Sequence, residues 1–184
     1  MKGLKLGQKV LIIGSPGSGK STLGKKLHKI TNYPLHHLDV IWWRPNWTHI
    51  SDDEFLNKIN SITSTDAWII DGQYSRNLEV RLQKADTVIF LDYKRGVCIS
   101  RILKRIIKHH KIPRDDIYEG CPEKLDFSFL KWTWGYPKRE KPNIYKFMKK
   151  YENVNWIVFK NTKELNKYLK ILENNSFLPS LKRH

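Results

Sequence analysis

The chain has 184 residues, 40% of them hydrophobic, so it is long enough for one domain with a complete core and too short for two ordinary domains. It carries 34 Lys and Arg against 18 Asp and Glu, and this net charge of +16 favours anionic partners without identifying them. No apolar stretch approaches the length of a membrane span, and the two cysteines lack the spacing of a disulfide framework or a zinc site. We therefore expect a cytoplasmic protein with no membrane partner.

Short apolar runs alternate with amphipathic segments along most of the chain. Apolar and β-branched runs predict strands over residues 9–13, 33–38, 68–70, 87–91 and 154–159. Apolar residues at helical spacing predict helices over residues 20–30, 51–63 and 95–109. This alternation is typical of an α/β fold in which helices cover both faces of a parallel sheet, as three layers, α/β/α.

Two segments interrupt the alternation. Residues about 40–66 are expected to form an acceptor-binding insertion, and residues about 109–142, rich in prolines, charges and aromatic residues, a lid-like insertion over the carboxyl edge of the sheet. The last eleven residues, 174–184, show no clear periodicity and are expected to pack loosely or fray.

A glycine-rich segment follows the first predicted strand and precedes the first predicted helix. Residues 14–21, GSPGSGKS, match the phosphate-binding motif G-x-x-x-x-G-K-S/T without a mismatch. Glycines let backbone N–H groups point inward, and the helix N-terminus adds partial positive charge, so the loop forms a cradle for anions. The residues predicted to bind ATP or another nucleoside triphosphate are Gly14, Pro16, Gly17, Ser18, Gly19, Lys20, Ser21 and Thr22.

The motif also predicts separate roles for two of its side chains. Lys20 is expected to reach the β- and γ-phosphates, and the Ser21 hydroxyl to bind Mg²⁺. Such a loop can also bind nucleotide in a protein that catalyses nothing, and this alternative stays open.

Two aspartates follow predicted strands, where the carboxyl ends of parallel strands share one edge of the sheet. Asp39 and Asp71 are both candidates to hold the water shell of the magnesium ion, with Asp71 preferred because a buried strand ends there before Gly72. If the acceptor is a hydroxyl, one of these carboxylates would take its proton as a general base. The alternative is that each aspartate only caps a strand or a loop.

The transferring phosphoryl group needs more positive charge than one lysine supplies. Arg76, Arg101 and Arg105 are the candidates, and Arg114 and Arg139 would join them if the insertion closes like a lid. In a chain this basic, the alternative for any arginine is a solvated surface charge.

Three tryptophans cluster just after Asp39. The rings of Trp42, Trp43 and Trp47 would stack on a base or a ring-shaped acceptor, unless they pack against the neighbouring helix.

Four spaced motifs carry a family resemblance: Leu38-Asp39 with Trp43, Pro45 and Trp47; residues 68–76 (WIIDGQYSR); residues 119–124 (EGCPEK); and residues 132–138 (WTWGYPK). Over roughly residues 8–160 the chain resembles the bacterial DNA topology modulation proteins, which are adenylate-kinase-like P-loop proteins. The resemblance implies a P-loop NTPase fold with a five-stranded parallel sheet of order 2-3-1-4-5. Residues 1–184 would then be a single P-loop kinase-like domain.

The wider adenylate-kinase-like group implies roles for particular residues. Its Asp-Gly at the end of the third strand, followed by an arginine, resembles Asp71 and Arg76 here. Its R-x-x-x-R helix before the lid resembles Arg101 and Arg105, and its base contact after the last strand falls near Asn161. One departure is that QYS follows Asp-Gly here in place of Phe-Pro, so a nucleoside monophosphate acceptor is not implied.

The leading hypothesis is phosphoryl transfer from ATP, with Mg²⁺, to a small acceptor such as a nucleotide, a nucleoside or a hydroxyl metabolite. The catalytic candidates are Lys20, Asp39, Asp71, Arg101 and Arg105, and the candidates for binding the acceptor are Asp39, Trp43 and Arg76. The alternative hypothesis is a nucleotide-binding regulator of DNA topology that binds DNA through its basic surface. The sequence leaves the acceptor and the oligomeric state open.

Overall fold

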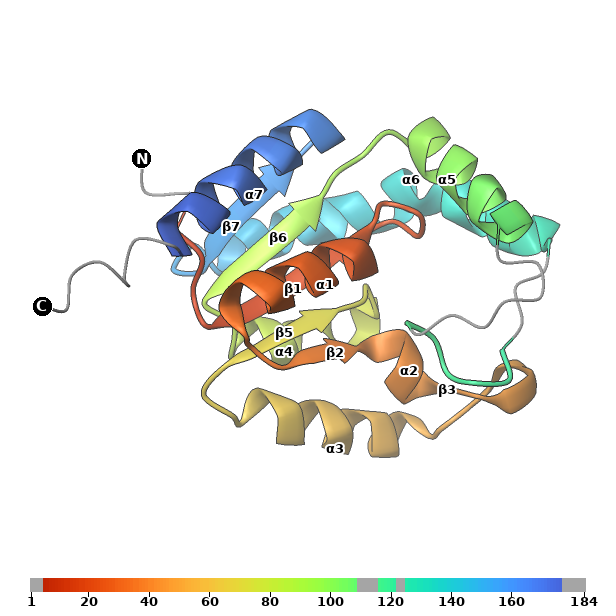
Figure 1. The fold of residues 1–184 in the computed structure, drawn as a ribbon. Helices are drawn as coiled ribbons and strands as arrows, with labels where there is room; N and C mark the ends of the chain where they lie inside the picture. The colour runs from red at the N-terminus through yellow and green to blue at the C-terminus, as the bar shows by residue number, and fades with distance from the viewer. Residues whose placement is uncertain (1–4, 109–115, 122–124, 177–184) are drawn as a thin grey trace, which may run out of the picture.

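A single parallel sheet organises the molecule (Figure 1). The computed structural model describes residues 5–108, 116–121 and 125–176. The five strands lie in the order β2-β5-β1-β6-β7, which is 2-3-1-4-5 when they are counted along the chain, so the predicted sheet is confirmed. The strands are β1 (Lys9–Gly14), β2 (Leu35–His37), β5 (Trp68–Asp71), β6 (Thr87–Leu91) and β7 (Asn155–Phe159).

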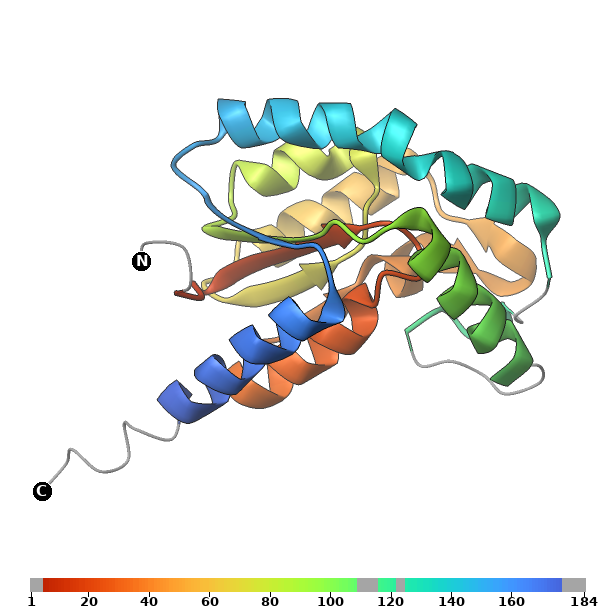
Figure 2. The ribbon, with the colours of Figure 1, turned by 90° about the horizontal axis from the view of Figure 1, so that it is seen from above.

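Helices cover both faces of this sheet, as the alternation of elements predicts (Figure 2). One face carries α1 (Lys20–Thr31) and α7 (Thr162–Ser176). The other carries α3 (Asp52–Thr63), α4 (Leu78–Leu82) and α6 (Phe127–Lys150). Helix α5 (Arg95–Lys108) lies beyond the carboxyl end of β6 and packs against α6.

The central strand β1 shows why the sheet is buried on both sides. Val10 and Ile12 pack on the α1 and α7 side, whereas Leu11 and Ile13 pack on the α3, α4 and α6 side, and all four side chains are fully buried. Burying each such side chain stabilises the fold by about 1.5–3 kcal/mol. A strand covered on both faces is expected to be continuously apolar, which is the pattern of this segment.

Short elements fill the region between β2 and α3, namely α2 (Leu38–Trp42), β3 (Trp43–Arg44), the 3₁₀ turn η1 (Pro45–Trp47) and β4 (Thr48–His49). A second 3₁₀ turn, η2 (Ser75–Asn77), lies between β5 and α4. Strands β3 and β4 pair antiparallel as a small separate sheet. Helix α3 then begins after Ser51, whose hydroxyl accepts a hydrogen bond from the Glu54 N–H at 3.1 Å.

Helix α6 is the main feature that the sequence patterns do not predict. It spans 24 residues with Pro137 and Pro142 inside it, and prolines normally break helices because they lack an N–H and clash with the preceding turn. Here Asp126 caps the N-terminus by accepting from the Phe129 N–H at 3.1 Å, and buried side chains anchor the helix to the core. Packing therefore outweighs the local cost of the prolines.

Some expectations differ from the structure, and others concern residues outside its described ranges. Residues 174–176 were expected in a loose tail, but they form the end of α7, because α7 packs along the sheet as far as its last turns. Residues 177–184, 109–115 (including Arg114) and 122–124 lie outside the described residues. Within the described ranges, no helix is both long enough and apolar enough to cross a membrane.

Candidate active site

The loop between β1 and α1 wraps around the N-terminus of α1. Gly14, Gly17 and Gly19 have positive φ angles of 147°, 74° and 97°, which residues with a side chain rarely adopt. A Cβ atom on Gly17 would stand 2.4 Å from the Cys98 carbonyl oxygen, so only glycine lets the loop lie against α5. The curled backbone therefore has the form that the phosphate-binding motif requires.

Lys20 lies across this loop. Its ammonium group donates to the carbonyl oxygens of Gly14 at 3.0 Å and Ser15 at 3.1 Å. Burial lowers the pKa of Lys20, and the nearby carboxylates of Asp39 and Asp71 oppose that shift. The lysine thus stands between the loop and two carboxylates, where a phosphate would compete for its charge.

Asp71 ends the strand beside β1 and is 4% exposed. One carboxylate oxygen, Oδ1, lies 2.9 Å from His37 Nδ1, whereas Oδ2 is buried and has no hydrogen-bond partner among the described residues. Burial favours neutral His37, but the hydrogen bond and charge of Asp71 raise the pKa of His37 overall. A buried carboxylate oxygen without a donor is costly, so this site fits a cation or its bound water.

Asp39 is the second residue of α2, the helix that directly follows the edge strand β2. The Tyr74 hydroxyl donates to Asp39 Oδ1 at 2.7 Å, and burial, together with the Asp39 charge, raises the pKa of Tyr74. The phenol therefore stays protonated and acts as a donor. Tyr74 also has a φ angle of 30°, an unfavourable conformation that the surrounding structure must hold in place.

Arg81 anchors the loop between β5 and α4, which contains Tyr74. Its side chain is fully buried and donates to four backbone carbonyl oxygens, those of Gly72 (3.0 Å), Gln73 (2.8 Å), Tyr74 (2.9 Å) and Asn77 (3.1 Å). Burial lowers the pKa of Arg81 to about 9, so the guanidinium stays charged near neutral pH. This arginine fixes the path of the chain between Asp71 and α4.

Gln73 connects the phosphate loop to α6. Its Oε1 accepts from the Gly14 N–H at 3.2 Å and from the Tyr136 hydroxyl at 3.0 Å. Its Nε2 donates to the Ser75 hydroxyl at 3.2 Å, and Ser75 in turn donates to the Glu140 carboxylate. The β1–α1 loop, the β5–α4 loop and α6 thus share one polar network.

These loops open into one cleft of about 1060 Å³ at the carboxyl edge of the sheet. Most of the residues that the sequence singles out line it: Pro16, Gly17, Gly19, Lys20, Ser21, Thr22, Asp39, Trp43, Asp71, Arg76, Arg101 and Arg105. Gly14 and Ser18 belong to the loop but are not part of the lining, and Ser18 is buried. A volume of this size accommodates a nucleotide together with a second small molecule.

The arginines occupy different positions around the cleft. Arg101 donates to the Ser18 carbonyl at 3.0 Å and to the Thr162 hydroxyl at 2.6 Å, so it joins the phosphate loop to the chain after β7. Arg76 is exposed and pairs with Asp52 at 2.9 Å. Asn161 lies outside the cleft lining, and its Oδ1 accepts from the Glu164 N–H at 3.0 Å at the start of α7.

Sequence reasoning missed several residues of the site, namely His37, Gln73, Tyr74, Arg81, Tyr136 and Glu140. The segment QYS was visible as a departure from the adenylate-kinase-like pattern and was a signal for two of them. Tyr136 and Glu140 are four residues apart, a spacing that becomes informative only once residues 127–150 are known to be helical. We find no sequence signal for Arg81.

Comparison with known protein families identifies the family to which the chain belongs. The model of the AAA domain family AAA_18 matches residues 10–119, more than half of the chain. The chain belongs to this family. The match spans the phosphate loop, both aspartates and α5, so the AAA_18 segment contains most of the cleft lining.

Solved structures extend the likeness to nearly the whole chain. A shikimate kinase from Bacteroides thetaiotaomicron has 16% identity and a TM-score of 0.54, covering 92% of this chain and 98% of that one. The deoxyadenosine kinase of M. mycoides with bound dATP has 14% identity and a TM-score of 0.53, covering 90% and 97%. At these identities the likeness shows the fold, that of small P-loop kinases. No curated protein matches the chain in sequence.

Proposed function

We propose that this AAA_18 protein transfers the γ-phosphoryl group of ATP to a hydroxyl or phosphate of a small acceptor, which is a nucleotide, a nucleoside or a hydroxyl metabolite. The observation that carries the proposal is that Lys20, Asp39 and Asp71 line one cleft with the phosphate loop. The small-kinase fold supports it, because phosphoryl transfer needs little beyond positioning and charge.

Each group in the cleft has a role in this proposal. The loop N–H groups and Lys20 hold the triphosphate, and Arg101 and Arg105 stabilise charge on the transferring group. Asp39, oriented by the Tyr74 hydroxyl, accepts the proton of an attacking hydroxyl. Residues about 40–66 would form the acceptor wall. Of the lid-like insertion expected over about 109–142, residues 127–142 lie in α6, which is anchored to the core.

Magnesium fits the donor set at the loop. Within the described part of the chain, no three His, Cys, Asp or Glu side chains form a metal cluster, and Mg²⁺ in kinases relies on few protein ligands and on phosphate oxygens. Ser21 would bind the ion directly and Asp71 through water, using its buried, unpartnered Oδ2. When bound, the ion offsets the negative charge of the phosphate oxygens.

The test measures acceptor-dependent ADP formation with MgATP over a panel of nucleosides, nucleotides and small alcohols. Lys20→Ala should lower the turnover with the active acceptor by about 100-fold or more, the usual cost of removing one charge-stabilising donor. Lys26→Ala is the matched control, because Lys26 lies exposed on the same helix outside the cleft lining. Absence of acceptor-dependent turnover in protein that binds MgATP would refute the proposal.

Two observations favour a second function, a nucleotide-binding regulator that contacts DNA. The net charge of +16 and the resemblance to DNA topology modulation proteins support it. Electrostatic DNA binding should weaken steeply as salt concentration rises. A titration with duplex DNA that detects no affinity even at low ionic strength would remove this second candidate.

A further inference from the structure

Two pairs of aromatic rings line the cleft. Trp43 and Trp47 meet edge to face with ring centroids 5.4 Å apart, and they come from β3 and η1. Phe129 and Trp132 stack with centroids 6.1 Å apart and an interplanar angle of 18°, and they come from α6. Elements far apart in the sequence thus bring four rings to one cavity.

The Trp43–Trp47 pair follows the helix that carries Asp39, and the Phe129–Trp132 pair lies on α6, which packs against α5. Trp43 directly follows α2, whose second residue is Asp39. The Arg139 guanidinium stands 4.4 Å from the centre of the Trp132 ring and pairs with Glu140 at 3.0 Å, and Glu140 accepts from Ser75 in the loop after β5. The Phe129–Trp132 pair is thus linked through Arg139, Glu140 and Ser75 to the loop after β5, the strand that ends at Asp71.

The Trp47 corner carries strain and an unsatisfied donor. Asn46 and Trp47 both have φ angles of 60°, a left-handed conformation that is unfavourable for a bulky residue. The Trp47 indole Nε1 is buried and has no hydrogen-bond partner among the described residues. Backbone strain clusters at ligand-binding sites, and an unpaired buried donor leaves a hydrogen bond that a ligand can supply.

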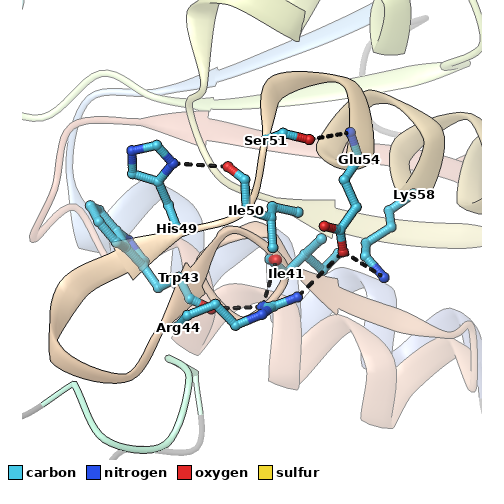
Figure 3. A network of polar contacts seen from close by, with 8 residues as sticks. All are labelled: Ile41, Trp43, Arg44, His49, Ile50, Ser51, Glu54 and Lys58. Carbon is cyan, nitrogen blue, oxygen red and sulfur yellow. Dashed lines mark hydrogen bonds and ion pairs between the residues drawn. The ribbon is translucent and has the colours of Figure 1, made fainter.

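Arg44 joins the segment before Trp47 to α2 and α3 (Figure 3). The Arg44 guanidinium donates to the carbonyl oxygens of Ile41 at 3.1 Å and Trp43 at 2.7 Å, and it pairs with Glu54 of α3 at 3.7 Å. A further bond runs from the Asn46 N–H to the Gly120 carbonyl at 3.0 Å. The backbone that leads into Trp47 is thus held in place before any ligand arrives, which lowers the entropy that binding must overcome.

We propose that the cleft recognises its acceptor by a planar heterocyclic ring. The ring stacks between the two aromatic pairs, and the Trp47 indole N–H donates to an acceptor atom in the plane of that ring. This step rests on the proposed phosphotransfer and deepens it: the substrate class is a ring-bearing alcohol, such as a nucleoside or its monophosphate, and not an acyclic polyol.

Calorimetric titration of protein saturated with MgADP tests the proposal. The ring-bearing probes are adenosine, thymidine and their 5′-monophosphates, and the ring-free probes are glycerol and ribitol. At least one ring-bearing probe should bind, and Trp132→Leu should weaken it by about tenfold, as expected for one lost stacking ring. Trp47→Phe, which keeps a ring and removes the N–H, should weaken binding less than Trp47→Leu.

Trp134→Leu is the matched control. Trp134 is 50% exposed on the same helix as Trp132, which is 46% exposed, but it stacks with Arg95 and lies outside the cleft lining. Its replacement should leave affinity unchanged within about twofold. A ring-free probe binding as well as the ring-bearing ones, or equal losses in the two tryptophan variants, would overturn the ring site.

The two proposals fail in distinguishable ways. Ring binding that depends on Trp132 without any ADP formation would refute the phosphotransfer and leave the ring site standing. Phosphorylation of glycerol or ribitol without ring binding would refute the ring site and leave the phosphotransfer standing. The nucleoside and monophosphate arms separate an acceptor without phosphate from one that carries it.

Discussion

Replacing the buried Arg81 by Met should unfold the β5–α4 loop and weaken the whole domain. The bond to the Gly72 carbonyl is fully buried, and leaving that oxygen unpaired costs about 1–3 kcal/mol. The bonds to the Gln73, Tyr74 and Asn77 carbonyls are partly buried, and each contributes about 0.5–1.5 kcal/mol. The variant no longer buries a charge, and this offsets part of the loss. We therefore expect the free energy of unfolding to fall by about 3–5 kcal/mol.

Urea denaturation followed by circular dichroism measures this change as a shift of the midpoint at constant slope. Lys84→Met is the control, because Lys84 is exposed just beyond α4 and its loss should stay within about 0.5 kcal/mol. The loss of stability in Arg81→Lys should lie between those of Arg81→Met and Lys84→Met, since one ammonium group cannot reach all four carbonyls. An Arg81→Met protein within about 1 kcal/mol of wild type would refute this account of the loop.

Two other predictions concern the edge of the sheet and the phosphate loop. In metal-free protein the free energy of unfolding should fall as pH rises from about 6.5 through the raised pKa of His37, because protonated His37 pairs with Asp71. Denaturation curves measured across pH test this dependence, and His37→Gln should remove it. Gly17→Ala, whose Cβ would meet an α5 carbonyl at 2.4 Å, should destabilise by roughly 2 kcal/mol or more and abolish ATP-induced thermal stabilisation. Gly96→Ala is the control, because its added Cβ would have no neighbouring atom within 4 Å, and it should be neutral or stabilising. Similar thermal shifts for the two variants would contradict the predicted clash between a Cβ on residue 17 and α5.

The central strands β1, β5 and β6 could be predicted because they are buried on both faces and therefore read as short apolar runs, two of which end at Gly14 and Asp71. The elements that were missed are those whose signal is not local. Pro137 and Pro142 argue against a helix, and only packing against the core keeps α6 intact. The elements β3 and β4 have two residues each, too few for any periodicity.

The phosphate loop and both aspartates could be placed from sequence, since strand order brings the carboxyl ends of β1, β2 and β5 together. The network around Gln73 could not, because its partners Gly14 and Tyr136 lie 59 and 63 residues away and no pattern links them. A role that a family resemblance implies for a residue also depends on where its side chain lies in the structure. Asn161 was expected at the nucleotide base, and its side chain bonds within the first turn of α7.

The shared oxygen of Gln73 has an evolutionary consequence. One carbonyl receives hydrogen bonds from the Gly14 amide and the Tyr136 phenol, so a shift in the position of α6 should also change the position of the phosphate-binding loop. Coupling of this kind is reciprocal, so mutations that retune α6 toward a new substrate should also alter the grip on nucleotide. Lineages that diversify this scaffold must therefore change both ends of the network together.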